Sequence, residues 1–267
     1  MKRLIGIVQF MTRIPIPIDT GFDEEFHKGI VYFPIVGLIL GICYYVLALA
    51  GLFFFNEYIT AILVLCGEAV LTGGLHLDGL GDTFDGLYSY RDKDRILEIM
   101  KDSRLGTNGL LAILFVMLLK AGLIYEILLS RSLLLLVIMP AVARTMQVFA
   151  CYKTKSPREK GMGNIFIGKV SGKMLIASYG FLVAVILGAL IVSNMGRSYS
   201  IAFEFESLGR SFFTIGSNVL ILTILTRLFI RSVYKKIDGV TGDILGAICE
   251  LSELVFIMIT YLVYRYM

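Results

Sequence analysis

Residues 30–55, IVYFPIVGLILGICYYVLALAGLFFF, contain no charged residue and exceed the roughly 20 apolar residues that cross a bilayer as a helix. Similar apolar runs recur along the chain. The mean hydropathy of +0.80 and a charged fraction of only 17% argue against a water-soluble domain. The sequence therefore predicts an all-α, polytopic membrane helix bundle of about seven transmembrane helices, at residues 30–55, 58–75, 110–129, 133–152, 174–193, 212–230 and 244–264.

Lysine and arginine residues are distributed unevenly between the predicted connections. Most of the 25 lie in the N-terminal segment, in the connections 76–109 and 153–173, and just after residue 230. By the positive-inside rule these segments are cytoplasmic, so the N-terminus is inside and the C-terminus outside. The net charge of +4 then reflects orientation, and we expect no nucleic-acid partner. The connections on the other side carry only Arg131, Arg197, Arg210 and Arg265.

The whole chain, residues 1–267, is expected to form a single integral membrane domain without a removable signal peptide. The four cysteines lie in or beside apolar runs without metal-ligand spacing and are expected to be core residues. The connection 76–109 begins with aspartates and glycines and continues as an amphipathic stretch at 91–100. We expect that stretch to lie along the cytoplasmic membrane surface.

The most informative local pattern is HLDGLGDTFDG at residues 76–86, where Asp78, Asp82 and Asp85 are spaced i, i+4 and i+7. If the second span continues as a helix, the three carboxylates share one face, and each i,i+4 pair repels by roughly 0.2–0.5 kcal/mol. A hard divalent cation such as Mg²⁺, held with substrate phosphates, offsets this repulsion. Glycines within the segment equally suit a solvated acidic loop. The spacing alone leaves both interpretations open.

A second acidic set, Asp243, Glu250 and Glu253, begins at the cytoplasmic end of the last span. Carboxylates inside a bilayer are costly, so these should face the bundle interior or a polar cavity. We expect Asp243 and Glu250, which share a helix face, to complete the metal site opposite the first set. Glu68 and Arg144 lie at similar depths and are expected to form an ion pair, or Arg144 binds a substrate phosphate.

Two other sequence patterns limit the classes of reaction that the protein could catalyse. Residues 163–169, GNIFIGK, satisfy the opening of a P-loop, but Val170 replaces the required Ser or Thr and no preceding strand is expected between membrane spans. A nucleotide-hydrolysing P-loop is therefore excluded. His27 and His76 are the only histidines, and no Ser-His-Asp pattern accompanies them. An aspartate-rich, histidine-poor membrane protein favours metal-assisted phosphoryl transfer over acyl transfer.

The sequence resembles the cobalamin synthase (adenosylcobinamide-GDP ribazoletransferase) family over nearly its whole length. The matching motifs are FMTRIP (10–15), FPIVG (33–37), GGLHLDG (73–79), DTFDG (82–86), LEIMKDSRLG (97–106), GMGNIFIGK (161–169) and TGDILGA (241–247), followed by Glu250 and Glu253. The resemblance implies an enzyme of the prokaryotic plasma (inner) membrane, with its active site facing the cytoplasm. It leaves open a homo-oligomer or association with other corrinoid-assembly enzymes.

The resemblance also implies the reaction and the site. In the Mg²⁺-dependent reaction, the ribose 3′-hydroxyl of α-ribazole, or of its 5′-phosphate, attacks the cobinamide-linked phosphorus of adenosylcobinamide-GDP, and GMP leaves. The implied catalytic residues are Asp78, Asp82, Asp85 and Asp102. The expected metal ligands are Asp78, Asp82, Asp85, Asp243 and Glu250. The expected substrate contacts are His76, Arg13, Arg104, Arg144 and Lys169.

Two other functions compete with this one. A CDP-alcohol phosphotransferase also uses an Asp-x-x-Asp-Gly motif, but its pattern continues with Ala-Arg, whereas Gly86 is followed here by Leu-Tyr-Ser-Tyr-Arg. An ion-coupled secondary transporter would use the embedded glutamates Glu68, Glu126, Glu250 and Glu253. Inverted repeats would support transport, and the sequence contains none.

Overall fold

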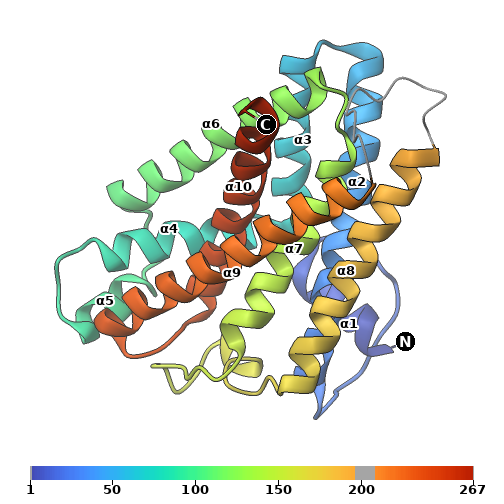
Figure 1. Cartoon of the computed structure of the whole chain (residues 1–267). Coiled ribbons are helices and arrows are strands. Elements are labelled where there is room, and N and C mark those ends of the chain that lie inside the picture. Colours follow the sequence, from blue (N-terminus) through green and yellow to red (C-terminus); the bar gives the residue numbers. More distant parts are fainter. Residues whose placement is uncertain (1, 196–207, 267) are drawn as a thin grey trace.

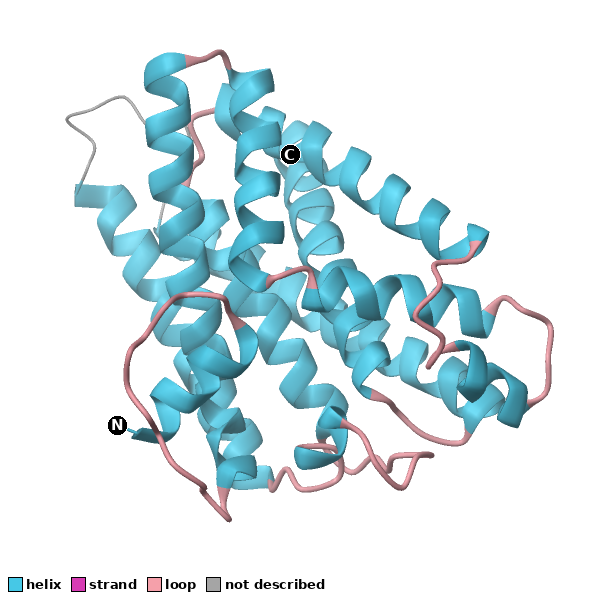
Figure 2. Cartoon of the chain, turned by 180° about the vertical axis from the view of Figure 1, so that it is seen from behind, coloured by secondary structure: helices cyan, strands magenta, loops and turns pink. Residues whose placement is uncertain are grey.

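The regular elements in the described part of the chain are all helices, as the sequence predicted (Figure 1, Figure 2). The computed structural model describes the backbone of residues 2–195 and 208–266, and the side chains of residues 2–192 and 212–266. The helices are α1 (Lys2–Met11), η1 (Phe26–Tyr32), α2 (Phe33–Phe54), α3 (Glu57–Thr72), α4 (Leu75–Leu87), α5 (Lys93–Ile99), α6 (Thr107–Leu129), α7 (Leu134–Cys151), η2 (Met162–Ile165), α8 (Gly172–Met195), α9 (Leu208–Ile237) and α10 (Gly242–Tyr266).

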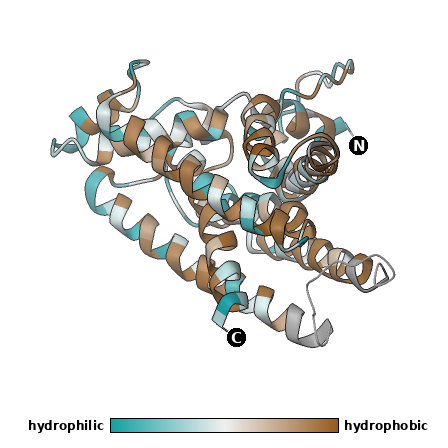
Figure 3. Cartoon of the chain, turned by 90° about the horizontal axis from the view of Figure 1, so that it is seen from above, coloured by the Kyte–Doolittle hydropathy of each residue, from teal (hydrophilic) through white to brown (hydrophobic). Residues whose placement is uncertain are grey.

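Six of the described helical segments are long and apolar enough to cross a membrane, and the bent pair α3–α4 adds a seventh candidate. They follow the predicted spans in order. Figure 3 shows hydrophobic residues along the long helices, with many of the hydrophilic residues near their ends. Outward-facing side chains such as Leu114 and Phe115 of α6 are 45% and 58% exposed, as expected for a surface that lipid covers. The orientation stays a prediction, and Arg197 and the side chain of Arg210 lie outside the described residues.

The second span differs from the prediction of one helix over residues 58–75. Helix α3 ends at Thr72, and α4 begins at Leu75 at an angle of 90° to it. Gly73 and Gly74 between them have φ values of +64° and +69°, a left-handed conformation that glycine adopts without strain. The bend turns α4 sideways from the end of α3 (Figure 1). The three aspartates therefore share a separate helix instead of prolonging α3.

Helix α7 lies at the centre of the bundle, with 89% of its residues buried. Helix α2 packs against it closely because Gly37 and Gly41 lack side chains. A Cβ atom at Gly37 would lie 2.4 Å from the carbonyl oxygen of Pro140, and one at Gly41 would lie 2.5 Å from that of Val137. Small residues allow membrane helices to approach in this way.

A second close crossing joins α4 to α10. A Cβ atom at Gly79 would lie 2.8 Å from the carbonyl oxygen of Asp243, and one at Gly246 would lie 3.1 Å from that of His76. The two glycines thus bring the backbones into contact. This crossing places the aspartate-bearing helix α4 beside the start of α10, which carries Asp243.

The predicted amphipathic stretch at 91–100 forms the short helix α5. Its apolar residues Ile96, Leu97 and Met100 are buried, and Met100 lies over Gly86 of α4. The apolar side of α5 thus packs on the protein. Its position along the membrane surface stays a prediction.

Candidate active site

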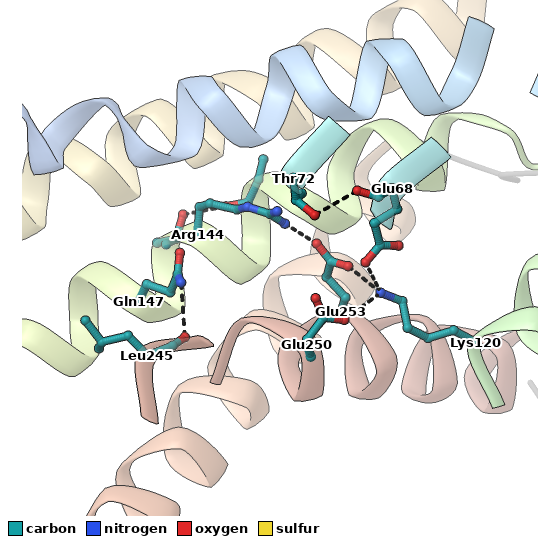
Figure 4. A network of polar contacts seen from close by, with 10 residues as sticks. Glu68, Thr72, Lys120, Arg144, Gln147, Leu245, Glu250 and Glu253 are labelled. Carbon is teal, nitrogen blue, oxygen red and sulfur yellow. Dashed lines mark hydrogen bonds and ion pairs between the residues drawn. The ribbon is translucent and has the colours of Figure 1, made fainter. Parts of the chain in front are cut away.

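Four helices bring charged side chains together in the bundle interior (Figure 4). Lys120 Nζ of α6 lies 2.5 Å from Glu68 Oε1 of α3 and 2.6 Å from Glu253 Oε2 of α10. It also donates to Glu250 Oε2 at 3.2 Å, and Arg144 of α7 binds the other oxygen of Glu253. These five side chains, which we call the ion network, are at most 3% exposed.

The ion network bears on two expectations. The predicted ion pair between Glu68 and Arg144 was wrong, because Glu68 pairs with Lys120 and Arg144 pairs with Glu253. Glu250, expected to ligate Mg²⁺ with Asp243, contacts Lys120, and its role as a metal ligand stays a prediction. Oxygens of Glu68, Glu250 and Glu253 converge within 4.8 Å, but the Lys120 ammonium already supplies their counter-charge.

A cavity of about 340 Å³ lies where α4, α10 and the connection between α7 and α8 meet. One part of its wall is aromatic: the Phe166 ring centroid lies 5.1 Å from that of Phe33 and 5.7 Å from that of Phe10. Backbone and buried polar groups, including His76 and Gln147, form another part. The charged lining residues are Asp78, Lys101, Arg158, Lys160 and Asp243.

The connection between α7 and α8 is held against the start of α10. Arg158 Nη1 donates to Asp243 Oδ2 at 2.8 Å, and Asn164 Nδ2 donates to the Arg158 carbonyl oxygen at 2.8 Å. Gly163 allows the close approach, since a Cβ atom there would lie 2.7 Å from the Gly242 nitrogen. These contacts fix a guanidinium group beside the predicted metal ligand Asp243.

The aspartates of α4 have different surroundings. Asp78 lines the cavity, and Asp82 lies one helical turn further along. Asp85 is engaged elsewhere: its carboxylate accepts hydrogen bonds from the backbone nitrogens of Gly106 at 2.7 Å and Gly109 at 2.9 Å. Asp85 therefore caps the N-terminus of α6, where backbone N–H groups lack helical partners.

Asp78 and Asp82 offer the type of ligand that a hard divalent cation takes. Within the described residues neither carboxylate forms a hydrogen bond or ion pair through its side chain, and the charges of Asp78 and Asp243 both act on Asp82. Carboxylates that repel one another in this way are the oxygen ligands that Mg²⁺ takes, together with phosphate oxygens. The chemistry of the donor set is therefore compatible with the expected cofactor.

Other predicted residues lie outside the cavity wall. Asp102 and Arg104 form an exposed ion pair at 2.5 Å, and the hydrogen bonds from Arg104 lower the pKa of Asp102 to about 2. Arg13 lies over Gly73 at the bend between α3 and α4. Lys169 is exposed, and Arg144 belongs to the ion network. Of the predicted site residues, the cavity brings together His76, Asp78 and Asp243.

Sequence reasoning missed six polar residues of the cavity, namely Lys101, Gln147, Arg158, Lys160, Asn164 and Thr241. The three cations were taken as orientation signals, because any cytoplasmic connection is rich in Lys and Arg. Gln147 could have been found, because a strongly polar side chain within a predicted membrane span needs a hydrogen-bond partner. The same holds for Lys120 at the centre of a predicted span.

Comparison with known proteins identifies the family. The model of the family described as cobalamin-5-phosphate synthase matches residues 3–261. Relatives named adenosylcobinamide-GDP ribazoletransferase include that of Clostridioides difficile, 49% identical over 98% of each chain, and that of Alkaliphilus metalliredigens, 44% identical over 97% of this chain and 96% of the relative. No solved structure matches the chain. The chain belongs to the cobalamin-5-phosphate synthase family.

Proposed function

We propose that the protein joins adenosylcobinamide-GDP to α-ribazole, or to α-ribazole 5′-phosphate, in the late nucleotide-loop assembly step of vitamin B12 biosynthesis. The observation that carries the proposal is the match of the family over residues 3–261, together with the name that relatives of up to 49% identity bear. The cavity supports it, because acidic groups for a metal and basic groups for phosphates line the same space.

The reaction exchanges one phosphoryl bond for another. The ribose 3′-oxygen forms a bond to the cobinamide-linked phosphorus, the bond from that phosphorus to the GMP oxygen breaks, and GMP leaves. The hydroxyl proton passes to a base. We assign this role to a carboxylate oxygen of Asp78 or Asp82 that the metal leaves free, since both carboxylates are unpaired within the described residues.

Mg²⁺ is the proposed cofactor, with Asp78 and Asp82 as the leading ligands and Asp243 beside them. A bound Mg²⁺ would neutralise the pyrophosphate and stabilise the negative charge that develops on the leaving GMP. Arg158, Lys160 and Lys101 add fixed positive charge around the same cavity. The aromatic wall of Phe10, Phe33 and Phe166 limits water, which would otherwise hydrolyse the pyrophosphate.

The proposed location is the plasma membrane, with the cavity open to the cytoplasm. The cavity lies at the helix ends whose connections carry most of the Lys and Arg residues. This orientation supplies the enzyme with cytoplasmic nucleotide substrates.

Turnover in detergent or lipid tests the proposal. Purified protein is incubated with adenosylcobinamide-GDP and α-ribazole 5′-phosphate over a range of Mg²⁺ concentrations, and corrinoid product and GMP are quantified. We expect equal amounts of the two products and no turnover with chelator. Asp82→Asn should lose at least about 100-fold in rate, because removing a charge that holds the metal removes its electrostatic contribution. Asp19→Asn, at an exposed position, is the matched control.

Two further assays distinguish the transferase from a CDP-alcohol phosphotransferase and from a transporter. Formation of a phosphodiester with release of CMP from a CDP-alcohol would indicate the phosphotransferase instead. Ion-coupled uptake without chemistry would indicate a transporter. If the Asp82→Asn enzyme has an unchanged rate and an unchanged Mg²⁺ dependence, Asp82 is not a metal ligand.

A further inference from the structure

Gln147 presents an unpaired acceptor in the wall of the cavity. Its side chain is buried, and its Nε2 donates to the carbonyl oxygen of Leu245 at 3.0 Å (Figure 4). Since a carbonyl only accepts, this bond fixes which end of the amide is the nitrogen. The Oε1 atom is buried and accepts no hydrogen bond from any residue that the structure describes. Such an acceptor requires a donor, and a ligand in the cavity is the available source.

Arg158 presents the complementary feature for a phosphate. Its Nη1 is occupied by Asp243, whereas Nε and Nη2 are buried and have no hydrogen-bond partner in the described part of the chain. These two nitrogens share one edge of the guanidinium, the edge that binds two phosphate oxygens side by side. Lys160 and Lys101 line the same cavity and favour an anion there.

The two features are anchored within one turn of the same helix. Gln147 is tied to the carbonyl of Leu245, and Arg158 is tied to the side chain of Asp243. These residues lie about 3 Å apart along the axis of α10. The cavity thus combines an acceptor, an anion-binding edge and aromatic rings, which together suit a nucleotide with a flat, hydrogen-bond-donating base.

The two proposed substrates differ in this respect. Both carry a flat base, but guanine has donating N1–H and N2 amino groups, whereas the benzimidazole of α-ribazole, once joined to ribose, has no N–H. Of the two bases, only guanine can donate to the unpaired acceptor of Gln147. We infer that the cavity holds the GMP half of adenosylcobinamide-GDP, with Gln147 accepting from guanine and Arg158 binding the phosphate. This inference rests on the proposed function and adds which substrate occupies the cavity.

Nucleotide binding to the wild-type protein tests the inference without any variant. Dissociation constants are measured by calorimetry on the full chain in detergent, with Mg²⁺ present, for GMP, N1-methyl-GMP, IMP and AMP. Adenine has no donor at N1 or C2, and its N6 amino group lies where guanine has O6. We therefore expect GMP to bind about three- to tenfold more tightly than AMP, the range for one neutral hydrogen bond. N1-methyl-GMP or IMP should lose most of this preference, depending on which N–H donates. Equal affinity for GMP and AMP would overturn the inference.

Variants assign the preference to residues. Gln147→Met keeps the side-chain volume but removes the acceptor, so the ratio of AMP to GMP dissociation constants should fall toward one. Gln9→Met, outside the cavity, is the matched control and should keep the wild-type ratio. Arg158→Lys keeps the charge but loses the two-nitrogen edge, and should weaken GMP binding at least about fivefold while leaving guanosine binding unchanged. A Gln147→Met protein with the wild-type ratio, or an Arg158→Lys protein with wild-type GMP affinity, would contradict the assignment.

The two hypotheses fail in distinguishable ways. If corrinoid product forms but nucleotides bind without base preference, the proposed function stands and this inference fails. If GMP is preferred through Gln147 but no corrinoid product forms, the nucleotide site stands and the proposed reaction fails. If Gln147→Met instead weakens α-ribazole 5′-phosphate and leaves GMP unchanged, the cavity holds the acceptor substrate and the inference is overturned.

Discussion

Lys120 lies in the middle of an apolar helix and is completely buried. An ammonium group in that position is expensive unless acceptors surround it, and its three N–H donors reach Glu68, Glu250 and Glu253. The same three carboxylates would repel one another without it. The charge of each member is therefore tolerated because of the others, and the ion network acts as one unit.

We predict that Lys120→Met severely destabilises the protein. Removing the cation leaves buried carboxylates uncompensated, which costs about 3–5 kcal/mol in comparable buried pairs. The unfolding midpoint in detergent measures the effect, and Lys173→Met, at an exposed lysine, is the control. Adding Glu250→Gln to Lys120→Met should restore part of the loss, since it removes one uncompensated charge. Equal unfolding midpoints for Lys120→Met and the control Lys173→Met would show that the network contributes little to stability.

The sequence singled out Glu68 and Arg144 as buried charged side chains, but it did not predict which residues they pair with. Depth along a helix follows from residue spacing, and Glu68 and Arg144, which were expected at similar depths, both belong to the ion network. Partner choice depends on how each helix is rotated about its axis and on which neighbours touch. Those quantities arise from packing between distant segments, as Lys120 inserted between Glu68 and Glu253 illustrates.

Among the elements, the crossing of α4 and α10 has the most direct effect on the site. Gly79 and Gly246 have no side chains to separate the two helices, so the charges of Asp78 and Asp82 lie near that of Asp243 at the start of α10. The 90° bend at Gly73 and Gly74 turns α4 toward that crossing. The apolar runs predicted the span order, but a bend made by two glycines within an Asp- and Gly-rich stretch carries no hydropathy signal.

We predict that Gly79→Ala reduces both turnover and stability. Its Cβ atom would lie 2.8 Å from the carbonyl oxygen of Asp243, and overpacking of this kind costs about 1–3 kcal/mol. Gly122→Ala is the matched control, because nothing lies within 4 Å of a Cβ atom at that helical position. Rates and unfolding midpoints of the two variants are compared in the same detergent. Full activity of Gly79→Ala would mean that the spacing of α4 and α10 does not set the geometry of the site.

For the whole molecule the main prediction concerns orientation. We expect Asp92, in the connection before α5, to face the cytoplasm, and Arg131, between α6 and α7, to face the outside. Single cysteines at these positions are exposed to a membrane-impermeant maleimide in intact cells, after the native cysteines have been replaced. Labelling at 131 but not at 92 is the expected result. The reverse pattern would invert the molecule and move the cavity away from cytoplasmic nucleotides.

The ion network also has a consequence for how the protein is made. During synthesis Glu68 and Lys120 enter the bilayer together with Arg144, but the acidic partner of Arg144 arrives only with the last helix, which carries Glu253. Until the last helix is inserted, Arg144 therefore lacks the carboxylate that pairs with it in the folded protein, and a charge without a partner in the bilayer is costly. In a full-length Glu253→Gln protein Arg144 keeps no charged partner, so we predict that its half-life in a pulse-chase experiment is shorter than that of the wild type. The charges of the network are therefore balanced only once α10 has been inserted.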